Sequence, residues 1–295
     1  MLSLNTSELS PVQLQRYLQA AIAPRPICFA STVDAAGNIN LSPFSFFNLF
    51  GSNPPMCVFS PARRVRDNTT KHTLENVQEV KECVINMVNY AMVQQTSLAS
   101  TEYAKGVNEF EKAGFTMLAS DMVRPPRVAE APVQLECVVR DIIPLGDQHG
   151  AGNLILAEVK CIHIQESILD AEGGIDQAKI DLVARLGGDW YCRVTKDNLF
   201  KVAKPLTTRG IGVDALPKAV RLSPVLSGND LGQLGNQEKM PPLEEIEALQ
   251  HTHQVKSILD ATIGDEANRT RELHELAKQL IAEGQIADAL KVVLM

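Results

Sequence analysis

The most informative segments of the sequence are Pro24-Arg25-Pro26-Ile27, Asn40-Leu41-Ser42-Pro43-Phe44-Ser45-Phe46-Phe47-Asn48 and Lys71-His72-Thr73-Leu74-Glu75-Asn76-Val77. In the second segment, serine, asparagine and backbone amides can hydrogen-bond a polar ring edge while the phenylalanines supply apolar area. In the third, Lys71 and Thr73 stand at the start of an expected helix, where free N–H groups and the positive end of the helix dipole favour an anion. The combination suits an aromatic ligand that carries a phosphate, although a phenylalanine-rich run is more often core and a single lysine is more often solvated.

The first two-thirds of the chain is predicted to be mainly β. Expected strands cover residues 26–33, 39–44, 56–60, 83–88, 133–143, 154–165 and 189–194, and a Gly/Asn-rich hairpin turn occupies residues 34–38. Helical pieces are expected at residues 73–82, 89–100 and 108–113. Because strands do not alternate regularly with helices, the pattern disfavours a doubly wound parallel sheet and favours a closed or partly closed antiparallel barrel.

Composition excludes several classes of function. The formal net charge of -7 argues against a nucleic-acid partner held by a general positive field. No segment is apolar for long enough to form a membrane helix, and the N-terminus lacks the features of a signal peptide, so we expect a cytoplasmic protein without membrane contact. The six cysteines are widely spaced, without a C-x-x-C pair, and are interpreted as small buried hydrophobic residues. No metal site is expected.

The last third of the chain has a different character. Residues 207–242 are rich in Gly, Pro, Ser and Asn and are interpreted as a linker or surface strap. Residues 243–295 show apolar side chains at helical spacing and are predicted to form a helical extension with two amphipathic helices. Because a lone hairpin cannot bury both apolar stripes, we expect the extension to pack on the barrel or on a second subunit. A single helix–turn–helix unit of the tetratricopeptide type is the alternative.

The motifs of residues 24–76 resemble the flavin reductase-like family, the FMN-binding split barrels that include flavoredoxin. The matching features are the Pro-Arg-Pro-Ile entry, Ser-x-Phe-Ser-x-Phe-Asn at 42–48, Asn-Pro-Pro at 53–55 and Lys-x-Thr at 71–73. Further similarity lies at residues 108–116, 131–137, 158–163 and 185–191, so the resemblance extends over about residues 15–205. His72 stands where the family usually has Asp, which puts any role of that Asp in doubt here.

The resemblance implies an antiparallel six-stranded split β-barrel over residues 1–206, with helical insertions and FMN near the interface of a homodimer. Ser42, Phe44, Ser45, Phe46 and Asn48 would line the flavin; Ser60, Arg63, Lys71 and Thr73 would surround its phosphate; and Arg25 and Pro26 would flank the ring. Because side chains alternate along a strand, Phe46 and Phe47 are not expected to face the flavin together. FMN is expected in preference to FAD, because no second glycine-rich turn is present for a pyrophosphate.

The resemblance also suggests roles for two later residues. His163 could donate a proton or hold a nicotinamide, or it could be a hydrogen-bonded histidine on a barrel strand. Tyr191 could bind substrate or close the end of the barrel. Three functions remain open: an NAD(P)H-dependent flavin reductase that could serve a monooxygenase or another electron-acceptor protein; a flavoredoxin-like carrier that does not use NAD(P)H directly; and a flavin-binding interaction module. No nicotinamide motif is visible to choose between NADH and NADPH.

Overall fold

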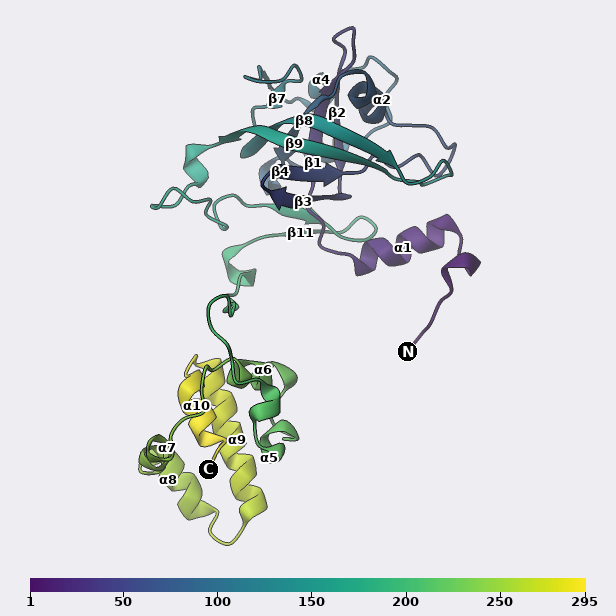
Figure 1. Cartoon of the computed structure of the whole chain (residues 1–295). Coiled ribbons are helices and arrows are strands. Elements are labelled where there is room, and N and C mark those ends of the chain that lie inside the picture. Colours follow the sequence, from purple (N-terminus) through teal and green to yellow (C-terminus); the bar gives the residue numbers. More distant parts are fainter. The chain divides into compact units, whose positions relative to one another are not determined.

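The computed structural model describes residues 1–295 and divides the chain into two compact units, Met1–Phe200 and Lys201–Met295. Figure 1 shows the strands gathered in the first unit and helices alone in the second. The change of unit lies close to the predicted domain end at residue 206. No helix in either unit combines the length and the apolar character that crossing a bilayer requires.

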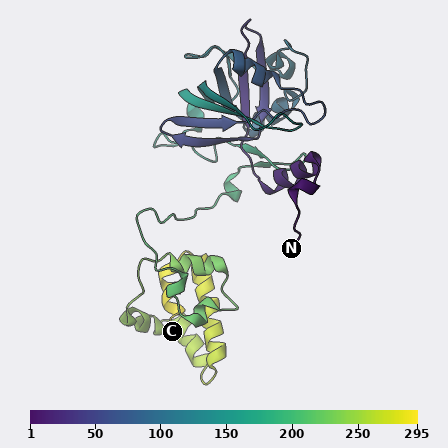
Figure 2. The same cartoon turned by 45° about the vertical axis from the view of Figure 1, so that its right-hand side comes forward.

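The first unit is built on a seven-stranded sheet in which all neighbouring strands are antiparallel. The strand order is β2-β1-β5-β8-β9-β4-β3, and the strands are β1 Cys28–Val33, β2 Ile39–Phe44, β3 Phe47–Ser52, β4 Pro55–Phe59, β5 Glu82–Met87, β8 Val133–Pro144 and β9 Asn153–Ile164. The curvature of the sheet is visible in Figure 2. The predicted barrel architecture is confirmed, with one strand more than the six predicted, because β3 pairs with β4 across a bulge between Leu49 and Gly51.

Strand β1, which lies between β2 and β5, is buried on both faces, and this explains its almost continuous apolar sequence. Cys28 and Ala30 face one hydrophobic cluster, which also contains Phe59, whereas Phe29 faces a second cluster that contains Phe110. Cysteines 28, 57, 83 and 137 are all free and buried in the first of these clusters. The interpretation of these four cysteines as small core residues is therefore confirmed.

Short elements surround the sheet. The helices are α1 Pro11–Ala21, α2 His72–Glu79, α3 Val93–Leu98 and α4 Glu109–Ala113, and two small hairpins are formed by β6 Met117–Leu118 with β7 Arg127–Val128 and by β10 Val183–Arg185 with β11 Tyr191–Arg193. Helix α1 begins at a capping box in which Ser10 and Gln13 satisfy each other's backbone N–H groups.

The predicted final strand is confirmed as β11. A backbone bridge between Arg25 and Arg185 joins its hairpin to the start of β1.

The second unit consists of helices α5 Lys218–Arg221, α6 Gly228–Gly235, α7 Leu243–Gln250, α8 His253–Ala261, α9 Glu266–Ala282 and α10 Ile286–Val292. Residues 207–242, predicted to be a linker, instead contain α5 and α6 and supply Leu216, Val220 and Leu234 to the buried core of this unit. The prediction failed because α5 and α6 are too short to show a sustained helical spacing of apolar residues in the sequence. Their apolar side chains nevertheless pack into one core in the folded unit.

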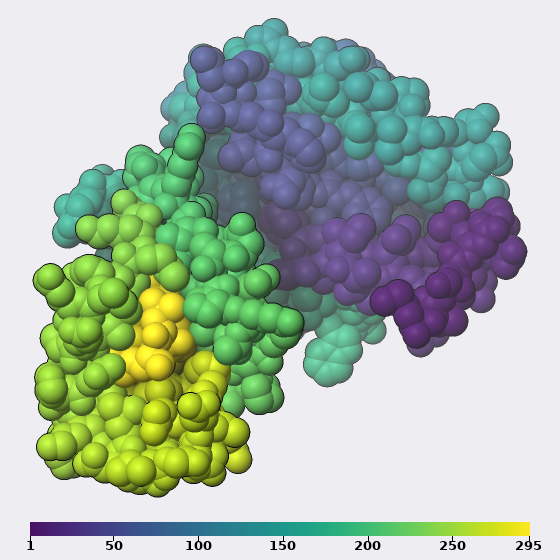
Figure 3. Space-filling model, turned by 60° about the horizontal axis from the view of Figure 1, so that its bottom comes forward, coloured from purple at the N-terminus to yellow at the C-terminus, as the bar shows by residue number.

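Helices α9 and α10 bury their apolar stripes inside their own unit. Leu273 and Leu280 of α9 and Leu290 of α10 share one hydrophobic cluster with residues of α5, α6 and α8. Figure 3 shows the end of the chain, in yellow, flanked by green and yellow-green segments of the same unit. The expectation that these helices need the barrel or a second subunit as a cover is therefore wrong, because the segments that precede them in sequence supply the covering surface.

Candidate functional site

A cleft of about 630 Å³ lies in the first unit, at the end of strand β2. Three segments line it: the β2 end with Pro43, Phe44 and Ser45, the segment 90–100 with Tyr90, Gln94, Thr96, Ser97 and Ser100, and the 183–193 hairpin with Val183, Arg185, Asp189, Tyr191 and Arg193. A volume of several hundred cubic ångströms with mixed apolar and polar walls is typical of a small-molecule site. Phe44, Ser45 and Tyr191 were predicted to be site residues, and the cleft brings these three together.

Two cation–aromatic pairs form the wall contributed by the hairpin. The guanidinium carbon of Arg185 lies 4.6 Å from the ring centroid of Tyr191, and that of Arg193 lies 3.8 Å from the ring of Tyr90. Asp181 holds Arg193 through two hydrogen bonds of 2.7 and 2.8 Å and thereby raises the pKa of the guanidinium. The cleft therefore has an aromatic wall with two arginines, each near a carboxylate, Arg193 at 2.7 Å from Asp181 and Arg185 at 3.9 Å from Asp189. Sequence analysis missed the pair of Tyr90 and Arg193 because these two residues are brought together only by the fold.

A smaller polar pocket adjoins this cleft. It is lined by Asn40, Ser42, Arg64, Lys71, His72, Thr73, Ser100, Thr101, Glu102, Tyr103 and Glu109. Ser100 lines both cavities, and Ser42 and Phe44 lie two residues apart on β2. The ammonium of Lys71 lies 5.8 Å from the ring centroid of Phe44. The predicted phosphate residues Lys71 and Thr73 therefore sit beside the predicted ring-contacting residue Phe44.

Lys71 carries a charge without a direct partner in this pocket, where the nearest opposing influence is the Glu102 carboxylate. It is the N-cap residue of α2, its ammonium forms no hydrogen bond or ion pair, and burial together with the nearby Arg64 lowers its pKa. Arg64 itself is paired with Glu102 at 3.0 Å. A partly buried ammonium without a partner, at a helix start whose first N–H groups have no side-chain cap, is well suited to bind an anion.

Two hydroxyl groups stand close to this charge. Thr73 is buried, and its Oγ1 accepts a hydrogen bond of 2.9 Å from the side-chain amide of Asn40. The Thr73 hydroxyl proton therefore remains available to a ligand oxygen. Ser42 is half-buried and its side chain forms no hydrogen bond within the chain. The pocket thus combines one free cation with two hydroxyl donors, a donor set that matches a phosphate group.

Arg25 has a structural role in this fold. Its guanidinium donates hydrogen bonds to the carbonyls of Gln19 and Ile22 at the end of α1, and another of 2.9 Å to the carbonyl of Leu186. Burial and the charge of Arg185 lower its pKa. Arg25 therefore clamps α1 and the β10–β11 hairpin to the start of β1. Its backbone pairs with that of Arg185, and its guanidinium has a long contact of 3.5 Å with Ser45 Oγ at the cleft.

The remaining predicted cofactor residues lie outside both cavities. Phe46 and Arg63 line a separate cavity of about 410 Å³ beside α1, and Arg63 is bound to Asn68 through hydrogen bonds of 2.7 and 2.8 Å. Ser60 is buried and accepts a hydrogen bond from the backbone N–H of Asn153. Asn48 is exposed on the edge strand β3, and Pro26 is half-buried without lining either cavity.

Phe46 and Phe47 point in different directions, as predicted. Phe46 is 42% exposed and lines the cavity beside α1, whereas Phe47 packs against the barrel core. Phe44 and Phe46 are two residues apart, and alternation alone would place them on the same side of a strand. The bend at residues 45–46, between the end of β2 and the start of β3, separates them instead. Sequence reasoning grouped all of these residues in one site and could not distribute them between the two cavities.

His163 lies apart from the cleft. It stands on β9, and its Nε2 forms a hydrogen bond of 2.7 Å with Glu136 of β8. His163 lines neither the cleft nor the polar pocket. The catalytic role expected for His163 therefore stays a prediction that the geometry of the cleft does not support, and the alternative of a hydrogen-bonded histidine on a barrel strand describes its surroundings.

The family profile for the flavin reductase like domain matches residues 21–179, more than half of the chain. The chain belongs to the flavin reductase-like family. Among curated relatives, an uncharacterized protein of Aquifex aeolicus is 36% identical over 189 residues, which is 64% of this chain and 94% of that protein. The uncharacterized protein YwrF of Bacillus subtilis is 27% identical and covers 67% of this chain and 96% of its own length.

Solved structures of flavin reductase-like proteins show the same barrel. Nitrilotriacetate monooxygenase component B from Bacillus cereus is 28% identical, with a TM-score of 0.64, and the match covers 68% of this chain and 98% of that one. The 2-nitrobenzoate 2-nitroreductase NbaA of Pseudomonas fluorescens is 26% identical, with a TM-score of 0.61, covering 74% of this chain and 100% of that one. The family profile ends at residue 179 and so does not describe the helical unit.

Proposed function

We propose that this member of the flavin reductase-like family binds FMN in the cleft and its adjoining pocket and uses it as an NAD(P)H-dependent oxidoreductase. The single observation that carries the proposal is the unpartnered ammonium of Lys71, which lies 5.8 Å from the ring of Phe44. A cofactor with an aromatic ring and one phosphate needs a cation and an apolar side chain near each other. The cation holds the phosphate through charge-assisted hydrogen bonds, and the apolar side chain contacts the ring.

In this proposal Lys71, Thr73 and Ser42 hold the phosphate, and Phe44 and Ser45 contact the ring. The bound flavin supplies the redox chemistry, accepting a hydride equivalent and passing electrons on. The chain orients the reactants in the cleft, where the guanidinium groups of Arg185 and Arg193 can donate hydrogen bonds to an anionic group. The single small polar pocket favours FMN over FAD, since a pyrophosphate would require a second anion site.

Tyr191 and Arg185 are the residues that we assign to the substrate or nicotinamide. They pair across the hairpin at the cleft wall, where a planar molecule can stack on the tyrosine and an anionic group can reach the arginine. Two acceptor classes are compatible with this wall. The name of the Bacillus cereus relative points to a monooxygenase partner, and that of the Pseudomonas relative points to a nitroaromatic acid.

The decisive experiment is anaerobic reduction of the FMN-loaded full chain. We expect NADH or NADPH to bleach the absorbance of the bound flavin, and the faster of the two identifies the donor. If dithionite bleaches the flavin but neither nicotinamide does, the chain is a flavoredoxin-like carrier. If the chain neither retains nor binds FMN, the proposal fails as a whole.

We also propose that the chain forms a homodimer. Strand β3 is an edge of the main sheet, and its residues Leu49 and Phe50 are 62% and 70% exposed. An edge strand with neighbouring exposed apolar side chains is costly in a monomer and is usually covered. Light scattering should give twice the chain mass, and Phe50→Asp should shift the protein to monomer; a wild-type chain that elutes as a monomer at micromolar concentration would contradict this.

A further inference from the structure

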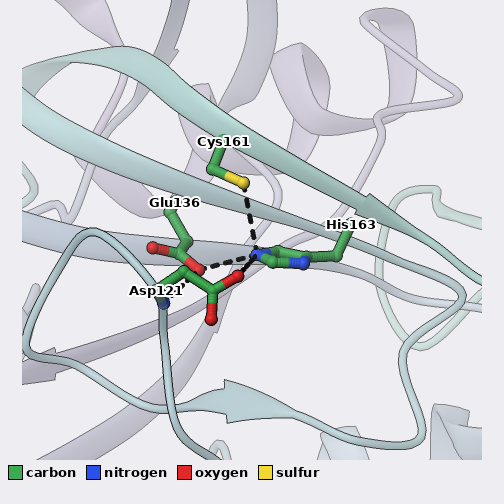
Figure 4. Close-up of side chains that lie close together, drawn as sticks. All are labelled: Asp121, Glu136, Cys161 and His163. Atoms are coloured by element: carbon green, nitrogen blue, oxygen red, sulfur yellow. Dashed lines mark hydrogen bonds and ion pairs between the residues drawn. The ribbon is translucent and has the colours of Figure 1, made fainter.

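Four metal-ligating side chains converge at one place on the barrel. Asp121 comes from the loop between β6 and β7, Glu136 from β8, and Cys161 and His163 from β9 (Figure 4). Their nearest ligand atoms all lie within 4.8 Å of one another. Cys161 and His163 are two residues apart on one strand and so share a face, and Glu136 is the cross-strand partner of Cys161. The pairing of β8 with β9 therefore brings three of the four side chains together.

The contacts share one atom, Nε2 of His163. This nitrogen lies 2.7 Å from Glu136 Oε1, 3.5 Å from Cys161 Sγ and 4.0 Å from Asp121 Oδ2. Figure 4 shows the three contacts meeting at the ring nitrogen. In a cysteine–histidine–carboxylate triad the thiol and the carboxylate use different ring nitrogens. Here Glu136 and Cys161 contact the same nitrogen, so the cluster is not such a triad, and its four ligand atoms lie within 4.8 Å of one another.

The separations fit a tetrahedral ion after small movements. Zinc bonds of about 2.0 Å to nitrogen or oxygen and about 2.3 Å to sulfur place neighbouring ligand atoms about 3.3–3.6 Å apart in a tetrahedron. The separation of 3.5 Å between Cys161 and His163 already has this value. The Glu136 contact would lengthen by about 0.6 Å and the Asp121 contact would shorten by about 0.7 Å. Asp121 can make this movement because its side chain is 66% exposed.

Backbone amides hold the buried carboxylate in place. The Glu136 side chain is fully buried, and its two oxygens accept hydrogen bonds from the backbone N–H groups of Asp121 at 2.9 Å and Met122 at 2.6 Å. Burial by itself disfavours the charge, but these bonds and His163 keep the pKa of Glu136 below its usual value. Such bonds fix the orientation of a ligand in the way that outer groups do at metal sites.

We infer that Asp121, Glu136, Cys161 and His163 form a binding site for a divalent transition metal with the ligand preference of Zn²⁺. Thiolate, imidazole and carboxylate are the ligand types of zinc, and the softer thiolate disfavours Mg²⁺ and Ca²⁺. The exposed side chain of Asp121 gives the ion access from solvent. The bound ion would tie the loop 119–126 to strands β8 and β9. None of the four residues lines the flavin cleft, so this inference is independent of the proposed function.

Cobalt titration of the metal-free full chain tests the site. We expect one equivalent of Co²⁺ to bind with a thiolate-to-cobalt absorption band in the near ultraviolet and with the intense visible bands of tetrahedral coordination. Cys161→Ser should abolish the near-ultraviolet band. Cys192→Ser is the matched control, because Cys192 is the only other half-buried cysteine, and it should leave the spectrum unchanged.

Zinc affinity and zinc-induced thermal stabilisation provide the second measurement. In competition with a chromophoric chelator, His163→Ala and Cys161→Ser should weaken Zn²⁺ binding at least tenfold, whereas His253→Ala, in the helical unit, should not. Zinc should raise the melting temperature of the wild-type chain and of the controls only. Absence of the thiolate band in the wild type, or zinc affinity that is unchanged in either cluster variant, would show that Glu136 and His163 form a hydrogen-bonded pair only.

Discussion

The split-barrel unit and the helical unit differ in how many buried polar residues they contain. Of the sixteen buried polar or charged residues, fourteen lie in the split-barrel unit and two, Thr262 and His274, lie in the helical unit. A buried polar group costs stability unless it is hydrogen-bonded, so a unit that keeps many of them is organised for more than packing. The free ammonium of Lys71 and the convergent cluster at His163 both lie in the first unit. The helical unit is held mainly by one apolar core.

The largest expected effect tests the independence of the two units. Leu290 is 1% exposed in the core of the helical unit, and Leu290→Ala should cost about 2–5 kcal/mol of that unit's stability because it leaves a cavity. Calorimetry of the full chain should show the helical transition moved to lower temperature while FMN affinity is unchanged. Leu222→Ala, at an exposed position, is the control. A loss of FMN affinity in the same variant would show that the two units are not independent.

The next effect concerns binding in the barrel unit. Lys71→Met removes the charge but keeps the side-chain length, so FMN should bind about tenfold more weakly or worse, since charge-assisted hydrogen bonds contribute about 1.5–3 kcal/mol. Riboflavin, which lacks the phosphate, should be affected far less. Titration calorimetry with both ligands measures this, and Lys81→Met, at an exposed lysine, is the control. Equal losses for FMN and riboflavin would assign Lys71 to the fold and not to the phosphate.

A helix cap gives a smaller effect, confined to the second unit. Asp265 caps α9 by accepting a hydrogen bond of 3.0 Å from the backbone N–H of Asn268. Asp265→Ala should therefore destabilise the helical unit by about 1 kcal/mol, and Asp265→Asn should restore most of the loss. The helical transition in calorimetry reports both values. An unchanged transition in Asp265→Ala would mean that core packing alone determines where α9 begins.

The smallest effect is a pH dependence of the helical unit. His274 is buried, its Nδ1 lies 2.7 Å from Ser223 Oγ, and burial lowers its pKa below the ordinary value of 6.5. The folded state therefore favours neutral His274, so its contribution is present above pH 6.5 and is lost as the pH falls through the lower folded pKa. The midpoint temperature for thermal unfolding of the helical unit should therefore fall as the pH is lowered from 7.5 to 5.5. His274→Gln should flatten the drop and His253→Gln should not; the same slope in His274→Gln would contradict the assignment.

Local sequence patterns predicted most strands because their signals are local. The alternating and apolar runs of β1, β2, β4, β5, β8 and β9 were all visible, whereas β3 was missed because its residues Asn48, Leu49 and Gly51 have no clear alternation. Its strand character comes from pairing with β4. The same limit explains the helical unit, in which α5 and α6 are short and become visible only through the core that they complete.

The candidate site was predicted in part. The sequence identified Phe44, Ser45, Lys71 and Thr73, since these residue types stand in recognisable local motifs. It could not find Tyr90 or Arg193, whose pairing depends on the contact between two segments about a hundred residues apart in the chain. It also gave Arg25 a cofactor role, whereas the fold uses this guanidinium to cap backbone carbonyls. A cation in a motif does not reveal whether its hydrogen bonds are already taken.

The sequence by itself determined the antiparallel barrel, the helical character of the C-terminal region and the position of a lysine at a helix start. These follow from periodicity and from short motifs, which express the local preferences of the backbone. Only the tertiary structure decided that residues 211–236 belong to the helical core, that Phe46 and Phe44 enter different cavities and that Asp121, Glu136, Cys161 and His163 meet. The physical reason is that strand register and chain reversal bring distant residues together, and neither is encoded in any single segment.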